Sequence, residues 1–217
     1  MSNSQVGTYK FEAFPFHLDV RGKLSMGVLG KHLLNCADAY AAERGFDVVE
    51  QGGEHYTWVL SRLAIELEDL PSCHESFSIQ TWVENVYRLF ADRNFVICNK
   101  DEKPIGYVRS VWAMISMETR NPANLLDLHG DRITNSICEK ECPIAKPGRI
   151  KVSQQEAVSE YVAKYSDLDI NGHVNSIKYI EHILDIFPLD IYKKKALKRF
   201  EIAYVAESYY DDTLSFY

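Results

Sequence analysis

The sequence lacks several features that would place it in a functional class at once. It has no apolar run approaching the roughly 20 residues that a membrane-spanning helix needs, and its first ten residues contain no signal-peptide core. Positive charge is also in short supply, because the formal net charge is −7 at pH 7. General nucleic-acid binding needs a surplus of Lys and Arg to neutralise phosphates. We therefore expect a cytoplasmic protein with no membrane span and no nucleic-acid partner.

Cysteine is scarce, and the common catalytic motifs are missing. The five cysteines are scattered and form no C-x-x-C pair, so neither a disulfide framework nor a zinc site is predicted. The G-x-S-x-G elbow, the P-loop, the dinucleotide glycine fingerprint and H-E-x-x-H are all absent. We expect no metal and no cofactor. Five histidines stand apart in the sequence and are interpreted as structural or surface residues: His17, His32, His55, His74 and His129.

An internal repeat at an offset of 150 residues is the strongest positive signal. Residues 18–24 (LDVRGKL) align without a gap with residues 168–174 (LDINGHV), and the similarity continues for several residues beyond. In both copies apolar residues then recur at spacings of three or four, which predicts a helix with one apolar stripe. Gly45 is expected to end the first helix and Pro188 the second.

Four segments rich in β-branched and aromatic residues follow the first helix, and turn-like residues separate them. They predict strands at residues 56–68, 75–87, 92–99 and 104–117. A helix followed by an antiparallel meander is an α+β unit whose sheet wraps its apolar face around the helix. The second copy offers only 196–208 and 213–217 as strands, so we expect an incomplete second unit. Either the C-terminus is missing from this sequence or the second sheet is short.

These patterns predict an α+β fold built from two tandem units. Residues 1–120 would form the N-terminal unit, 121–150 a linker and 151–217 an incomplete C-terminal unit. The linker is proposed because that segment combines several prolines with mixed charge and little apolar periodicity.

A dense group of polar residues precedes the second predicted helix. Residues 166–175 (SDLDINGHVN) contain two aspartates, two asparagines and a histidine. Asp and Asn are common in turns and helix caps, so structure alone is one explanation, above all for Asn175. The first copy, however, has Arg and Lys where the second has Asn171 and His173. An imidazole that titrates near neutrality, beside an amide at a helix start, favours a catalytic role for His173.

The sequence is similar to the acyl-acyl-carrier-protein thioesterases of plants and bacteria over nearly its whole length. The similarity rests on residues 57–62 (TWVLSR), 81–83 (TWV), 110–114 (SVWAM), 166–179 (SDLDINGHVNSIKY) and 203–208 (AYVAES). The D-x-N-x-H stretch with its V-N-x-x-K-Y continuation is the specific part. This resemblance implies two hotdog units, each a long helix wrapped by an antiparallel sheet. It also implies an enzyme that hydrolyses fatty acyl thioesters of acyl carrier protein to free fatty acid.

Carried over residue by residue, the resemblance assigns catalytic roles to Asp169, Asn171, His173 and Glu207. In the implied mechanism Glu207, oriented by Asn171, acts as base on a water, while Asp169 holds His173. N–H groups at the start of the second helix would receive the oxyanion. Which of Glu207 and His173 takes the proton stays open. The family pattern offers a cysteine nucleophile after the glutamate, but this chain has Ser208 there, which favours a water-based mechanism.

The first unit has a complete meander and no catalytic set, so we expect it to hold the acyl chain. Three tryptophans on its sheet are the predicted substrate-binding residues: Trp58, Trp82 and Trp112. The implied partner is an acidic acyl carrier protein that carries the chain on phosphopantetheine. Five basic residues are candidates for docking it: Lys193, Lys194, Lys195, Lys198 and Arg199. A solvated loop is an equally good interpretation of that run, and a homodimer is left open.

Two other functions remain open on sequence alone. The same fold could act on acyl-CoA, or it could bind acyl thioesters as a regulator without turning them over. The first copy has already lost both polar groups, which shows that such loss occurs within this fold.

Overall fold

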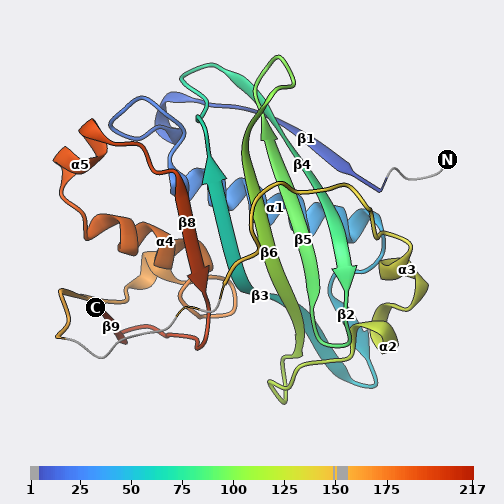
Figure 1. Cartoon of the computed structure of the whole chain (residues 1–217). Helices are drawn as coiled ribbons and strands as arrows, with labels where there is room; N and C mark the ends of the chain where they lie inside the picture. Colours follow the sequence, from blue (N-terminus) through green and yellow to red (C-terminus); the bar gives the residue numbers. More distant parts are fainter. Residues whose placement is uncertain (1–4, 149, 151–155) are drawn as a thin grey trace.

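The computed structural model of the chain describes residues 5–148, 150 and 156–217. Its centre is an antiparallel sheet curled around helix α1 (Met26–Glu43), which lies behind the sheet in Figure 1. The strand order is β1 (Gly7–Glu12), β4 (Ser76–Val86), β5 (Ala91–Cys98), β6 (Pro104–Ser116), β3 (Glu54–Leu67) and β2 (Val49–Gln51). The four predicted strands are confirmed to within two residues at each end, whereas β1 and β2 were not predicted.

Helix α1 forms because its sequence supplies both a cap and an apolar stripe. Ser25 accepts a hydrogen bond from the backbone N–H of Val28 at 3.3 Å, which satisfies one free donor of the first turn. The buried stripe includes Leu29 and Leu33, which pack against the inner face of the sheet. Gly45, with φ +68°, follows the last turn as predicted, because glycine enters the left-handed region without strain.

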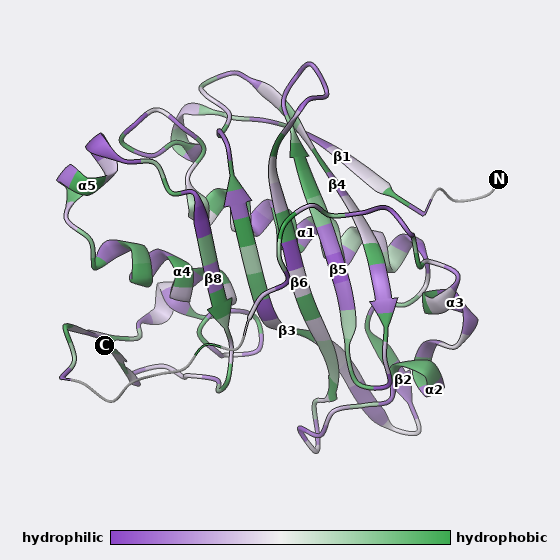
Figure 2. Ribbon diagram, viewed as in Figure 1, coloured by the Kyte–Doolittle hydropathy of each residue, from purple (hydrophilic) through white to green (hydrophobic). Residues whose placement is uncertain are grey.

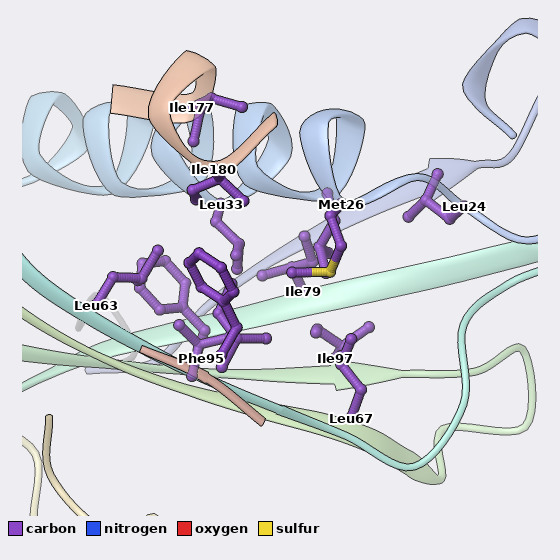
Figure 3. Close-up of a cluster of buried hydrophobic side chains, with 14 of the residues drawn as sticks. Leu24, Met26, Leu33, Leu63, Leu67, Ile79, Phe95, Ile97, Ile177 and Ile180 are labelled. Atoms are coloured by element: carbon purple, nitrogen blue, oxygen red, sulfur yellow. The ribbon is translucent and has the colours of Figure 1, made fainter. Parts of the chain in front are cut away.

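Helix α4 (Ser176–Asp185) lies directly against α1 and completes the same core. Ile177 and Ile180 project from α4 into the cluster that contains Leu33, as Figure 3 shows. A methyl group at Gly30 of α1 would lie 2.6 Å from Ile177 Cδ1, so the two helices approach too closely for a side chain there. Burial of each isoleucine contributes about 1.5–3 kcal/mol to the stability of this helix pair.

Strand β8 (Arg199–Ala203) joins the sheet of the first unit. It pairs antiparallel with β3, opposite residues 62–66, and its inward residues Phe200 and Ile202 enter the core around α1. The sequence suggested a strand here that ran on to residue 208, but the pairing ends at Ala203. The two repeats therefore share one sheet and one core.

The rest of the second repeat is compact and lies beside α4. Strands β7 (Ser159–Val162) and β9 (Thr213–Phe216) form a separate two-stranded sheet. After α4 comes the short helix α5 (Leu189–Lys194), at the left edge of Figure 1. Two 3-10 turns, η1 (Pro15–His17) and η2 (Tyr165–Asp167), occupy equivalent places ahead of α1 and α4.

The predicted linker, 121–150, does more than connect the units. It contains helices α2 (Leu125–His129) and α3 (Asp131–Thr134), and then crosses the outer face of the sheet in Figure 1. The backbone N–H of Cys138 donates to the carbonyl of Val83 at 2.9 Å, which ties this crossing segment to β4. Residue 149 of the linker and residues 151–155 of the predicted second unit lie outside the described residues.

Hydrophobic and hydrophilic residues alternate along the strands in Figure 2, as expected for a sheet with two differently covered faces. Among the described helices, none combines the length and the apolar character that a bilayer span would require.

Candidate active site

A hydrogen-bonded turn presents the D-x-N-x-H residues. The Oδ1 atom of Asp169 accepts from the backbone N–H groups of Asn171 at 2.8 Å and His173 at 3.3 Å. The backbone N–H of Asp169 donates in return to the carbonyl of His173 at 2.8 Å. Gly172 at the tip has φ +78°, which glycine adopts without strain. Asp169 was predicted to hold His173, and the described contact is with the backbone N–H of that residue.

Helix α4 begins immediately after this turn. Its cap is Asn175, whose Oδ1 atom accepts from the backbone N–H of Ile177 at 2.9 Å. The first N–H groups of a helix have no intrahelical acceptor, so the N–H of Ser176 stays available at the positive end of the dipole. Tyr204 donates to the carbonyl of Ser176 at 2.9 Å, and burial raises its pKa, so it remains a neutral donor.

Backbone pairing brings Glu207 next to the turn. The N–H of Val174 donates to the carbonyl of Ser208 at 2.8 Å, and His173 and Tyr209 form an antiparallel bridge. As a result, Nδ1 of His173 lies 3.5 Å from Oε1 of Glu207. The Tyr209 ring packs edge-on against the imidazole with ring centroids 4.9 Å apart, which limits its rotation.

Arg120 is the site residue that the sequence did not reveal. It follows β6, and its guanidinium forms an ion pair with Oε1 of Glu207 although the two residues are 87 positions apart. Its φ of +59° lies in the left-handed region, which is uncommon for a residue with a side chain. Asn171 was predicted to orient Glu207. The described contacts of the Glu207 carboxylate are with Arg120 and His173, and the role of Asn171 stays a prediction.

One cavity of about 370 Å³ joins these polar groups to the interior of the first unit. Its polar end is lined by Asp169, Asn171, His173, Glu207 and Arg120. The rest of its lining comes from Phe46, from Ile133 and from residues of α1, β3, β4, β5 and β6. The residues from those elements include Leu34, Ala37, Leu60, Val83, Ala91 and Arg93. The predicted catalytic residues and two predicted tryptophans, Trp58 and Trp112, thus line a single space.

Trp82 lies outside this cavity, and the prediction that it contacts substrate is wrong. It is 0% exposed and packs on the outer face of the sheet with Val96 and Cys142. Its indole N–H donates to the carbonyl of Lys140 at 2.9 Å. Successive side chains of a strand point to opposite faces, so it is the neighbouring Val83 that reaches the cavity.

The basic run lies at the opposite end of β8 from Glu207, and its members are not equivalent. Arg199 is engaged by Glu66 and Glu201, so it supports the sheet. Lys193 lies 3.5 Å from Asp190, and Lys198 donates to the carbonyl of Glu68 at 3.3 Å. Lys194 and Lys195 are exposed and have no ion pair within the described part of the chain.

The corresponding turn of the first copy lacks the polar groups that meet in the second. The N–H of Leu24 donates to the carbonyl of Pro71 at 2.8 Å, which repeats the bond that positions Glu207 in the second copy. The residue before Pro71 is Leu70, so an apolar side chain takes the place of the glutamate. Arg21 is held in an ion pair within its own turn. The first copy has thus lost a third polar group, which a fixed offset of 150 residues does not reveal.

The other histidines lie away from the cavity. His129 is buried and stacks on Trp58 with ring centroids 5.8 Å apart. The rings of His17 and His32 pack edge-on with centroids 6.0 Å apart. Within the residues that the structure describes, no three His, Cys, Asp or Glu side chains are grouped so that they could hold a metal.

Two protein-family models match successive parts of the chain. Residues 5–130 match the acyl-ACP thioesterase N-terminal domain, and residues 150–217 match the acyl-ACP thioesterase C-terminal domain. The chain belongs to the acyl-ACP thioesterase family. The resemblance seen in the sequence is thereby confirmed.

Solved structures of acyl-ACP thioesterases confirm the double hotdog fold. One from Bacteroides thetaiotaomicron is 61% identical with a TM-score of 0.91, over 97% of this chain and 85% of that one. A 12:0-ACP thioesterase from Umbellularia californica, 17% identical, shares the fold with a TM-score of 0.79 over 96% of this chain and 80% of that one.

A curated relative is the chloroplast palmitoyl-acyl carrier protein thioesterase of Gossypium hirsutum, which is 26% identical over 187 residues, or 83% of this chain. The chain spans 45% of the length of that acyl-ACP thioesterase.

Proposed function

We propose that this chain hydrolyses fatty acyl thioesters of acyl carrier protein, releasing free fatty acid and holo acyl carrier protein and so ending chain elongation. The observation that carries the proposal is the single cavity that links the His173 and Glu207 pair to an apolar interior. An acyl chain inside that interior would leave its thioester at the polar end. Membership of the acyl-ACP thioesterase family supports the same substrate class.

The chemistry requires a base, a water and an oxyanion site. Glu207 takes a proton from a water whose oxygen attacks the thioester carbonyl carbon, and the carbonyl electron pair moves onto its oxygen. The N–H of Ser176 and the amide of Asn171, both at the cavity, stabilise that oxyanion. Collapse of the tetrahedral intermediate breaks the C–S bond, and the departing thiolate receives the proton held by Glu207.

Two side chains support Glu207 from different directions. Arg120 holds one carboxylate oxygen in an ion pair, and His173 approaches the same oxygen at 3.5 Å. The imidazole is thereby placed to orient the water or to relay its proton. Ser208 supports the water mechanism indirectly, because its carbonyl is used to pair with Val174 and its side chain does not line the cavity.

A thiol-release assay with acyl-carrier-protein and acyl-CoA substrates tests the proposal. We expect the carrier-protein substrate to give the higher kcat/KM, and Glu207→Gln to lower kcat by about 10²-fold or more with the fold intact. Faster hydrolysis of acyl-CoA would favour the alternative substrate. Binding of acyl-carrier protein without thiol release would instead indicate a regulator.

We also propose that an acidic carrier protein docks on Lys194 and Lys195. They are exposed, and their charge is not compensated among the described residues of an otherwise acidic chain. The five residues of β8 separate them from the catalytic end by about 16 Å at about 3.3 Å per residue. The phosphopantetheine arm would have to span that interval to deliver the thioester.

A further inference from the structure

A charged residue interrupts the apolar inner face of β5. Side chains at alternate positions of this strand face α1, namely Ala91, Arg93, Phe95 and Ile97, and three of them are apolar. Arg93 is nevertheless 6% exposed, although arginine is rarely buried unless it is paired. Figure 2 shows the hydrophilic stretch in the middle of β5.

The contacts of Arg93 leave most of its hydrogen-bonding capacity unused. Its Nη1 atom lies 3.4 Å from Oγ1 of Thr81, and its Cζ atom lies 4.6 Å from the centroid of the Tyr40 ring. No carboxylate pairs with it anywhere in residues 5–148, 150 or 156–217. Arg109 on the adjacent strand shows the contrast, because it pairs with Glu84 at 2.9 Å. A guanidinium has five N–H donors, so Arg93 can still bind an acceptor.

The guanidinium is at the inner part of the acyl cavity. Arg93 lines that cavity beside Val83, its pairing partner on β4, whereas Glu207 follows the end of β8. From β8 across β3 and β6 to β5 there are three strand spacings, or about 14 Å at about 4.8 Å each. Burial lowers the pKa of Arg93 to about 10, which leaves it protonated at neutral pH.

We propose that Arg93 is a specificity-determining residue that binds an oxygen atom carried near the far end of the acyl chain. A hydroxyl, an oxo group or a carboxylate at that position would accept hydrogen bonds from the unpaired donors. An unmodified chain of the same length would displace water from the guanidinium and supply no acceptor. The inference rests on the proposed function, because the chain enters as a thioester held at Glu207.

The test compares matched acyl thioesters of about 8 to 14 carbons, a range set by the strand spacings, in unmodified, ω-hydroxy and ω-carboxy forms. At the length that reaches Arg93, we expect kcat/KM for an oxygenated chain to exceed that of the unmodified chain by about tenfold or more. The ω-hydroxy and ω-carboxy arms show which oxygen is preferred. Equal values across every matched pair would overturn the inference.

Variants assign the preference to this side chain. Arg93→Met should abolish it, since methionine has a similar length and no N–H donor. Arg93→Lys should retain part of it, because one ammonium replaces the guanidinium fork. Arg109→Met, on the opposite face of the sheet, is the matched control and should keep the preference. A preference that survives in Arg93→Met would also overturn the inference.

A second readout separates this inference from the proposed function. Thermal shifts with free ω-hydroxy and unmodified fatty acids need no turnover. If the wild-type chain hydrolyses no thioester, the proposed function fails, yet a larger shift with the ω-hydroxy acid, lost in Arg93→Met, would still support the role of Arg93. Equal shifts for both acids would refute it.

Discussion

At the scale of single residues, the two repeats show how one fold can keep or lose a reactive centre. Both turns use an aspartate to bind the backbone that follows it. The second turn then places His173 beside Glu207 and Asn171 at the cavity, whereas the first presents charges that pair with their neighbours. The turn skeleton is therefore structural, and the chemistry depends on the side chains placed upon it.

Arg120 is predicted to position Glu207 for proton transfer. Arg120→Met should lower kcat by about tenfold to a hundredfold with little change in KM, because the carboxylate loses a charge-assisted hydrogen bond that fixes its direction. Arg120→Lys should restore part of kcat. Steady-state kinetics across pH 5.5–9 would measure this, with Arg21→Met in the first copy as the control that leaves kcat unchanged. A fall in thermal stability with normal kcat would mean that Arg120 is only structural.

The site residues of the turn could be predicted from the sequence because they form a local motif. Asp169, Asn171 and His173 lie within five consecutive positions, so their proximity follows from chain connectivity. Arg120 and Arg93 could not be found in the same way, because only strand pairing brings them to the cavity. Trp82 was assigned to the wrong face of its strand because the sequence does not show which face is the inner one. An alternation count over residues 81–83 shows that Trp82 and Val83 face opposite sides, but not which side is inner.

At the scale of elements, helix α1 and strands β3 to β6 were predictable, whereas β1, β2 and the pairing of β8 were not. β-branched and aromatic runs mark β3 to β6, and turn residues separate them. The partner of β8 depends on an edge of β3 that lies more than a hundred residues away in the sequence. Periodicity reports burial along a strand, but it carries no information about which edge the strand will join.

The histidine at the end of helix α2 makes the stability of the protein sensitive to acid. His129 is buried against Trp58, and burial lowers the pKa of the imidazole to about 4. The unfolded chain binds a proton at this residue below about pH 6.5, while the folded chain does not until about pH 4. Between those values the folded state loses stability as pH falls, by at most about 3 kcal/mol.

His129→Gln should weaken that acid sensitivity. We expect the difference in unfolding free energy between pH 7.5 and pH 5 to be smaller in the variant than in the wild type, measured by denaturant titration at both values. His55→Gln is the control: the hydrogen bond that the exposed His55 imidazole donates to Glu118 raises the pKa of that imidazole, so it contributes in the opposite direction. Identical pH dependence in wild type and His129→Gln would refute the assignment.

At the scale of the whole molecule, charge is distributed unevenly. The chain carries a net charge of −7, yet Lys194 and Lys195 extend from the end of α5 without acidic partners in the described structure. An acidic protein that approaches this surface would be attracted locally although the two molecules repel overall. The proposed docking residues and the candidate active site lie toward opposite ends of β8, so each can be altered separately.

Reversal of both charges tests that separation. Lys194→Glu with Lys195→Glu should raise KM for an acyl-carrier-protein substrate several-fold and remove most of its salt dependence, because complementary charge mainly speeds association. Hydrolysis of a short uncharged thioester should be unaffected. The same reversal at Lys100 and Lys103, in the turn between β5 and β6, is the control. An unchanged KM in the double variant would assign these lysines to solvent.

The late arrival of β8 has a consequence for biosynthesis. Glu66 on β3 and Arg199 on β8, which pair in the folded protein, are 133 positions apart in the chain. As the polypeptide leaves the ribosome, β3 can pair with β6 on one side. Its other edge, at residues 62–66, stays unpaired until β8 has been synthesised. An unpaired strand edge is a template for pairing with other chains. A nascent chain stalled before residue 199 would therefore expose an unpaired strand edge at residues 62–66, which could pair with other chains. A chaperone that protects such a chain would have to cover those five residues.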